Sequence, residues 1–221
     1  MRWTLKTTPN ITTVQQLSKD LSIDDTLSKL LVQRGVSTFE EAKKFFRPSL
    51  EELHDPFLLK DMNLAVSRIE KAIASNENIL IYGDYDVDGT TSVSLVASYL
   101  KTITTSISTY IPDRYDEGYG ISYQGIDFAA DNNFSLIIAL DCGIKAIDKV
   151  AYATKKKVDF IICDHHKPGP KIPDAVAVLN PKRVDCSYPY DELCGCGVGF
   201  KLVQALASKR GQTIEDLTQY L

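Results

Sequence analysis

From residue 78 onward, short apolar and β-branched runs alternate with segments of helical periodicity. The runs predict strands at 79–83, 106–111, 135–140, 158–163 and 175–179. The segments between and after them predict helices near 90–102, 122–131, 145–155 and 198–209. Because strands that alternate with helices form parallel sheets covered on both faces, we expect an α/β fold with a parallel five-stranded sheet flanked by helices.

The first 75 residues show helical spacing and no strand-like runs. Apolar residues recur at helical intervals in 14–21, 24–35, 37–46 and 61–75. We therefore expect a small helical N-terminal region over residues 1–75, followed by the α/β domain over residues 76–221. Residues 213–221 resemble the beginning of one more helix.

Composition narrows the class of protein. The net charge of −4 shows no global basic field, although a local basic groove is compatible with it. An odd count of five cysteines does not indicate a disulfide framework and fits a reducing cytoplasm. No apolar run approaches the roughly 20 residues that cross a bilayer, and the first residues lack the apolar centre of a signal peptide. We expect a cytoplasmic protein without a membrane segment.

Acidic and histidine residues follow three of the predicted strands. Because the carboxyl ends of parallel strands meet at one edge, these side chains should lie together. Clustered carboxylates raise one another's pKa unless a cation neutralises them, and oxygen ligands with one imidazole suit Mn²⁺ or Mg²⁺. The expected metal ligands are Asp84, Asp86, Asp88, Asp141 and His165.

Three residues at these strand ends are also predicted to carry catalysis. Two ions would clamp a phosphoryl group and activate a bridging water for in-line hydrolysis. Asp141, from a central strand, would bridge the ions, His165 would complete a site, and His166 would face the phosphate. Taken singly, each aspartate has another explanation, because an aspartate after a strand often caps the next helix. The histidines could be surface residues, but three clusters at three strand ends favour the metal site.

Two glycine-containing stretches are less specific. Residues 89–92, Gly-Thr-Thr-Ser, fit a phosphate-binding helix start and an ordinary helix N-terminus equally well. The pair Cys194 and Cys196 predicts a glycine-rich turn rather than a zinc site, because two thiols alone rarely hold zinc.

The motifs resemble a known family. Residues 84–89 (DYDVDG), 140–143 (LDCG) and 164–166 (DHH) resemble the first three motifs of the DHH phosphoesterase superfamily. Within it, residues 55–62, 112–120, 180–183 and 197–202 are similar to the RecJ family of single-strand-specific exonucleases. The resemblance implies a two-metal enzyme using Mn²⁺ or Mg²⁺, with single-stranded DNA as its partner. It implies 5′→3′ digestion to 5′-mononucleotides in DNA repair and recombination.

The resemblance also suggests contacts with DNA. It implies that Arg114 contacts a phosphate, and a loop ion pair with Asp116 or Glu117 is an equal alternative. Arg183, with its neighbour Lys182, would follow the DNA backbone, with solvated charge as the alternative.

The sequence departs from the family pattern at two points. Tyr82 stands where many superfamily members carry a histidine, so Asp84 is expected to supply the missing ligand. Nothing after Leu202 fits the fourth motif, a further metal-binding aspartate, and the family's second domain is missing. We therefore expect a DHH domain truncated before these parts, a fragment that binds metal weakly and degrades DNA poorly or not at all.

Two other functions remain open. One is a DHH-family phosphodiesterase acting on short oligonucleotides or cyclic dinucleotides, but such enzymes generally begin close to the first motif. The other is a non-catalytic RecJ-like scaffold, for which clustered carboxylates would be unnecessary.

Overall fold

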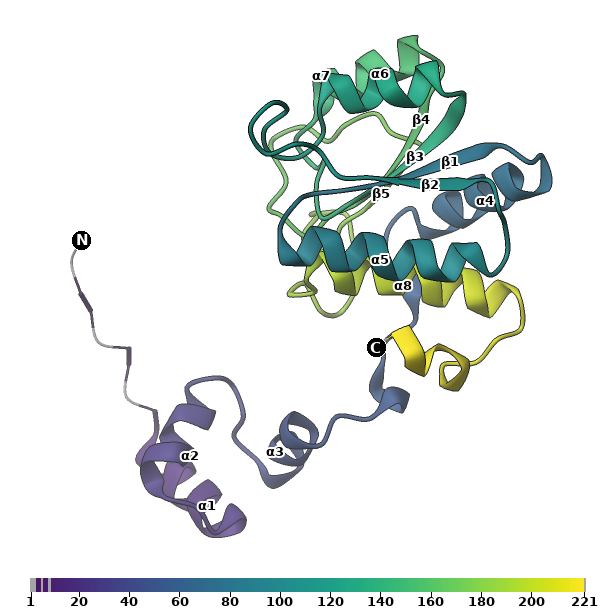
Figure 1. The fold of residues 1–221 in the computed structure, drawn as a ribbon. Coiled ribbons are helices and arrows are strands. Elements are labelled where there is room, and N and C mark those ends of the chain that lie inside the picture. Colours follow the sequence, from purple (N-terminus) through teal and green to yellow (C-terminus); the bar gives the residue numbers. More distant parts are fainter. Residues whose placement is uncertain (1–2, 5, 8, 221) are drawn as a thin grey trace. The chain divides into compact units, whose positions relative to one another are not determined.

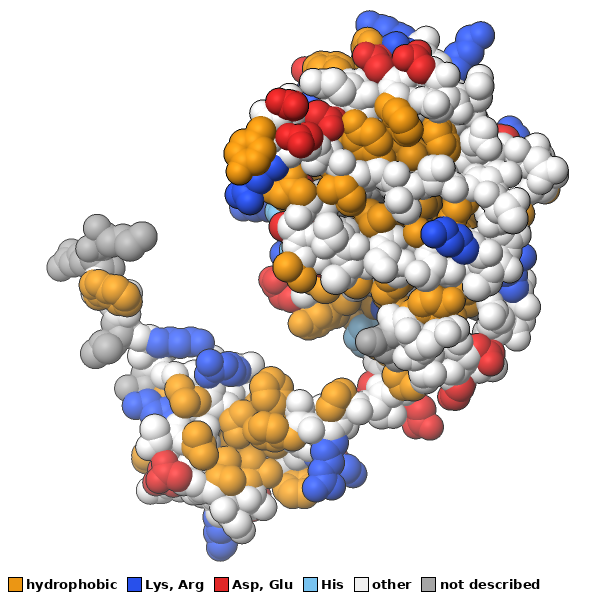
Figure 2. Space-filling view, in the orientation of Figure 1, with side chains coloured by type: hydrophobic (Ala, Val, Ile, Leu, Met, Phe, Trp, Pro, Cys, Tyr) orange, Lys and Arg blue, Asp and Glu red, His pale blue; other side chains and the backbone are white. Residues whose placement is uncertain are grey.

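The computed structural model describes residues 3–4, 6–7 and 9–220. The chain divides into two units, one ending at Leu53 and one beginning at His54. The first contains α1 (Ile11–Leu21), α2 (Asp25–Val32), α3 (Phe39–Phe46) and the short 3₁₀ helix η1 (Leu50–Glu52). Its small core consists of Leu17, Leu31, Val36 and Ala42. Figure 2 shows hydrophobic side chains gathered on the visible face of this unit.

The second unit is built on a five-stranded sheet with the order β2-β1-β3-β4-β5. All neighbouring strands are parallel. The strands are β1 (Asn78–Gly83), β2 (Ile107–Tyr110), β3 (Phe134–Leu140), β4 (Asp159–Cys163) and β5 (Ala177–Leu179). The five predicted strands are confirmed. The two central strands, β1 and β3, form the switch point at which open α/β sheets bind ligands.

Helices cover both faces of this sheet, which confirms the predicted α/β fold (Figure 1). One face carries α4 (Met62–Ala74), α5 (Val87–Lys101) and α8 (Gly195–Lys209). The other carries α6 (Tyr123–Asp131) and α7 (Ile147–Lys155). Two short 3₁₀ helices, η2 (Pro56–Leu58) and η3 (Glu215–Tyr220), complete the unit. None of the helices found in the described residues is long and apolar enough to cross a membrane.

Helix α4 lies in the second unit, although its helical spacing predicted that it belongs to the N-terminal region of residues 1–75. It packs against α8 and β5. Just before it, the Asp61 carboxylate accepts a hydrogen bond from the backbone N–H of Val178, 117 residues later. The amphipathic pattern of α4 resembles that of α1 and α2, so only its distant packing partners reveal where it belongs.

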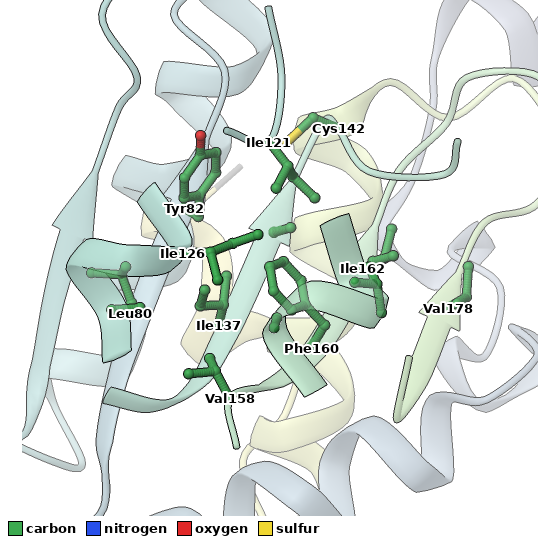
Figure 3. Close-up of a cluster of buried hydrophobic side chains, with 14 of the residues drawn as sticks. Leu80, Tyr82, Ile121, Ile126, Ile137, Cys142, Val158, Phe160, Ile162 and Val178 are labelled. Atoms are coloured by element: carbon green, nitrogen blue, oxygen red, sulfur yellow. The ribbon is translucent and has the colours of Figure 1, made fainter. Parts of the chain in front are cut away.

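The core beneath α6 and α7 comes mainly from the inner strands (Figure 3). It contains Leu80, Ile137, Phe160 and Ile162. Tyr82 is completely buried there. Its hydroxyl donates to the carbonyl of Gly120 at 3.0 Å and accepts from the backbone N–H of Ser122 at 3.1 Å. Tyr82, at the position where relatives were expected to carry a histidine, is therefore a core residue.

Candidate metal centre

Asp84 and Asp141 begin the site at the carboxyl ends of the two central strands. Asp84 follows β1 directly and Asp141 follows β3, and both side chains are buried. Asp84 Oδ1 accepts the backbone N–H of Tyr85 at 2.8 Å. Asp84 Oδ2 is buried without a hydrogen-bond partner among the described residues, and Asp141 Oδ1 is buried with no hydrogen bond, although His165 Nε2 lies 3.1 Å away. Since burying a carboxylate oxygen without a partner is costly, this pair of atoms is suited to a cation.

His165 lies next to these carboxylates from the end of β4. Its Nε2 is 3.1 Å from Asp141 Oδ1 and 3.5 Å from Asp88 Oδ2. Asp141, His165 and His166 each offer one ligand atom, and these atoms lie within 4.8 Å of one another. The structure therefore brings together residues from β3 and β4, as the motif spacing predicted.

The electrostatics of Asp141 agree with a cation site. Burial, followed by the charges of Asp88, Asp86, Asp164 and Asp84, raises the pKa of Asp141 to about 8. The carboxyl group would thus retain its proton near neutral pH unless a cation replaces it. Burial and the nearby carboxylates also raise the pKa of Tyr119, so its phenol stays protonated at the edge of the site.

Asp86 and Asp88 have local structural roles in addition. Asp86 is the N-cap of α5, and its Oδ1 accepts the backbone N–H of Gly89 at 2.9 Å. Asp88 Oδ2 and Oδ1 accept the backbone N–H groups of Gly195 and Cys196, each at 2.7 Å. Asp86 thus caps a helix, as the alternative explanation predicted, and the Asp88 carboxylate binds the positively polarised N-terminus of α8. Carboxylate oxygens keep further lone pairs, so both residues remain candidate ligands.

Two glycines allow the backbone to approach the buried carboxylates. A Cβ atom on Gly195 would lie only 2.4 Å from Asp141 Oδ1. A Cβ atom on Gly89 would lie 2.5 Å from the backbone oxygen of Asp84. Any larger residue at either position would displace a candidate ligand.

Asp164 is a functional candidate that was not among the site residues predicted from sequence. Its buried Oδ1 accepts the backbone N–H of His166 at 3.0 Å and lies 2.8 Å from His166 Nδ1. Its Oδ2 accepts the backbone N–H of Ile144 at 2.9 Å. Asp164 therefore orients the His166 ring, as outer carboxylates orient imidazoles in metal sites. Its position directly after β4 follows the same strand-end pattern and could have identified it.

Arg114 is exposed, and its guanidinium carbon lies 5.0 Å from the centre of the Tyr85 ring. Among the residues described, no ion pair joins it to Asp116 or Glu117. Glu117 instead accepts hydrogen bonds from the Tyr110 hydroxyl and the Asp113 backbone. The alternative of a loop ion pair is therefore not observed, and Arg114 stacks beside the first motif.

Arg183 has a structural role that its sequence context did not predict, and its contact with DNA stays a prediction. Its side chain is buried and forms ion pairs with Asp61 at 2.5 Å and Asp185 at 2.8 Å. It also donates to the carbonyl of Val178 at 2.6 Å. A guanidinium already paired with two carboxylates and a carbonyl has little capacity left for phosphate.

The two stretches that the sequence left open have ordinary helical roles. The hydroxyls of Thr90, Thr91 and Ser92 bond to carbonyls one turn earlier inside α5. Cys194 is the N-cap of α8, and its sulfur accepts the backbone N–H of Gly197 at 3.2 Å. These contacts favour the helix-start and turn interpretations.

Comparison with known proteins agrees with this fold. Residues 78–221 match the DHH family, N-terminal domain. The chain therefore belongs to the DHH family. It is 42% identical, over 217 residues, to the single-stranded-DNA-specific exonuclease RecJ of Bacillus subtilis (strain 168). That alignment covers 98% of this chain and 28% of the relative, so the chain spans less than a third of its length.

Solved RecJ structures are also similar to this chain. A crystal structure of exonuclease RecJ bound to manganese is similar with a TM-score of 0.64 at 28% identity, covering 70% of this chain and 39% of that one. The structure of RecJ from Thermus thermophilus in complex with Mn²⁺ has a TM-score of 0.72 at 23% identity. It covers 96% of this chain and 29% of that chain, and it supports the fold.

Proposed function

We propose that this chain carries the first part of a metal-dependent nuclease site. The activity would be 5′→3′ hydrolysis of single-stranded DNA to 5′-mononucleotides, in DNA repair and recombination in the cytoplasm. The observation that carries the proposal is the burial of two carboxylate oxygens that accept no hydrogen bond from the described residues, Asp84 Oδ2 and Asp141 Oδ1, the second of which lies 3.1 Å from His165 Nε2. The similarity to RecJ exonucleases indicates the substrate.

Mn²⁺ or Mg²⁺ fits the donor set of this site, which combines carboxylate oxygens with one imidazole. We propose Asp84, Asp86, Asp88, Asp141 and His165 as the residues that would hold it. Asp84 and Asp141 have the strongest claim, because each has a buried oxygen that accepts no hydrogen bond from the described residues. When bound, such ions polarise the phosphodiester and lower the pKa of a bound water.

The residues of the chain would position the DNA. His166 directs Nδ1 toward Asp164, which leaves Nε2 to donate to a phosphate oxygen as negative charge develops. Arg114, exposed beside Tyr85, would contact a phosphate of the strand and steer it toward the carboxylates. Asp141 and His165 would act directly at the scissile group with His166.

We further propose that the unit beginning at His54, which includes α4, forms the DHH domain and that the helices before it form a separate region. We also propose that these 221 residues alone hydrolyse DNA slowly. In the described part after Leu202, the acidic side chains of Glu215 and Asp216 are exposed. Asp216 accepts the backbone N–H of Thr213. Tyr220 packs on Tyr99, near the end of α5 opposite to its N-cap Asp86. No further carboxylate from the described residues of this segment joins the cluster.

Calorimetric titration with Mn²⁺ tests the site, and the Asp141→Ala variant is the control. We expect metal-dependent heat from the wild type and a strong loss in the variant. Absence of heat from the wild type would favour the scaffold function.

Digestion of long single strands labelled at either end, alongside dinucleotides, tests substrate and direction. Faster hydrolysis of dinucleotides than of long strands would favour a small-substrate phosphodiesterase.

A further inference from the structure

A cavity of 290 Å³ lies beside the candidate metal centre. Tyr119, Ile144, Lys145, Ala146, Lys149 and His166 contribute to its lining. It lies between the loop before α6 and the turn from β3 into α7. None of the proposed metal ligands lines it, so it is a separate space next to the carboxylates.

The chemistry of this cavity differs from that of the carboxylate cluster. Its walls are mainly apolar or aromatic, and its cationic side chains are Lys145 and Lys149. Asp164 is the one acidic residue among the described residues of the lining, and both of its oxygens are occupied by Ile144 and His166. A ligand in the cavity would therefore contact apolar and aromatic side chains together with the positive charge of the two lysines. Proteins bind a base and its phosphate with this combination.

His166 and Tyr119 connect the cavity to the metal centre. The His166 ring lies 4.6 Å from the ring of His165. Tyr119 meets His166 edge-on with ring centres 6.4 Å apart, and meets Tyr85 edge-on at 6.0 Å. His166 thus lines the cavity on one side and contacts the candidate ligand His165 on the other.

We propose that this cavity binds the base of the nucleotide whose phosphodiester is hydrolysed at the metal centre. This inference rests on the proposed function and assigns the substrate's base to a place within it. At 290 Å³ the cavity lies at the lower limit of small-molecule sites in proteins, which commonly measure about 300–1,000 Å³, so a single base is the part of a nucleotide that suits its size. Apolar walls hold a base without reading its hydrogen-bonding edge, so this site would accept any of the four bases.

Binding of dAMP and of deoxyribose 5-phosphate in Mg²⁺ tests the proposal, since the two ligands differ only by the base. We expect the wild type to bind dAMP roughly tenfold or more tightly, as base stacking predicts. Ala146→Trp fills the cavity and should abolish this preference, while Mg²⁺ binding is unchanged. Ala151→Trp is the matched control, because Ala151 is exposed on α7 and does not line the cavity. It should retain the wild-type preference.

A second measurement needs no variant. In methyl NMR spectra of the wild type, dAMP should shift the signals of Ile144 and Ala146, and deoxyribose 5-phosphate should not. Equal affinity for the two ligands, or a preference that survives Ala146→Trp, would overturn the inference. Failure of the proposed function would instead appear as absence of metal binding, which the calorimetric titration reports separately.

Discussion

The carboxylate of Asp88 accepts the backbone N–H of Gly195 at 2.7 Å, across 107 residues of sequence. A second bond of the same length joins Asp88 to the N–H of Cys196. The first motif thereby fixes the start of α8, and Gly195 in turn lies against Asp141. The geometry of the carboxylate cluster depends on this contact between α5 and α8.

Removing the Asp88 carboxylate should therefore loosen α8. Asp88→Ala leaves two helix N-terminal N–H groups without their acceptor, so we expect a loss of about 1–3 kcal/mol in the free energy of unfolding. Urea denaturation followed by circular dichroism measures it. Asp174→Ala, at an exposed residue with no hydrogen bond in the described structure, is the control and should change stability by less than about 0.5 kcal/mol. Equal effects of the two substitutions would show that the Asp88 carboxylate does not stabilise the start of α8.

Gly195→Ala should impair metal binding. The added Cβ would lie 2.4 Å from Asp141 Oδ1, so either the carboxylate or α8 must shift. We expect at least tenfold weaker Mn²⁺ binding by calorimetry. Gly169→Ala provides the comparison, because its Cβ would meet no atom closer than 3.6 Å. Wild-type affinity in Gly195→Ala would show that Asp141 does not hold the ion.

The metal-free protein should become less stable as the pH rises. The folded-state pKa of Asp141, about 8, lies above its ordinary value of 3.8. Between these values the folded state binds more protons than the unfolded state, so the free energy of unfolding falls as pH increases. Urea denaturation in EDTA at pH 5 and pH 8 measures this slope. Asp141→Asn should flatten it, and Asp174→Asn should leave it unchanged.

Arg183→Ala should destabilise the protein without a specific effect on DNA. Removing the guanidinium leaves the partly buried Asp61 without its cation, and we expect a loss of about 3–5 kcal/mol. Thermal and urea unfolding measure it. Lys182→Ala, which removes a pair with the exposed Glu192, is the neighbouring control and should cost little. If the Arg183→Ala protein is as stable as the wild type but binds DNA more weakly, the contact between Arg183 and the DNA backbone would be supported.

Arg114→Ala should weaken binding of single-stranded DNA while leaving stability unchanged. Loss of one phosphate contact should lower the slope of log affinity against log salt by about 0.7. Fluorescence anisotropy at several salt concentrations measures this slope. Lys101→Ala, at the C-terminal end of α5, is a control of equal charge change. An identical slope in the wild type and Arg114→Ala would exclude the phosphate contact.

Much of the second unit follows from local sequence. A strand of a parallel sheet that is covered on both faces is a continuous apolar run, so a run such as that of β3 identifies a strand. The polar residues that directly follow each run then lie at the carboxyl edge of the sheet. Asp84, Asp141 and His165 could therefore be grouped from sequence. The resemblance in three motifs agrees with the family match over residues 78–221.

Tertiary structure alone decided how individual charged groups are used. Arg183 looks like a free cation in sequence, yet its partner Asp61 lies 122 residues earlier. Asp88 looks equivalent to Asp84, yet its oxygens are occupied by α8, while one oxygen of Asp84 is buried without a partner among the described residues. Local periodicity reports which face of an element is buried. It does not report which distant backbone or side chain meets a carboxylate, because that depends on how α4 and α8 dock on the sheet.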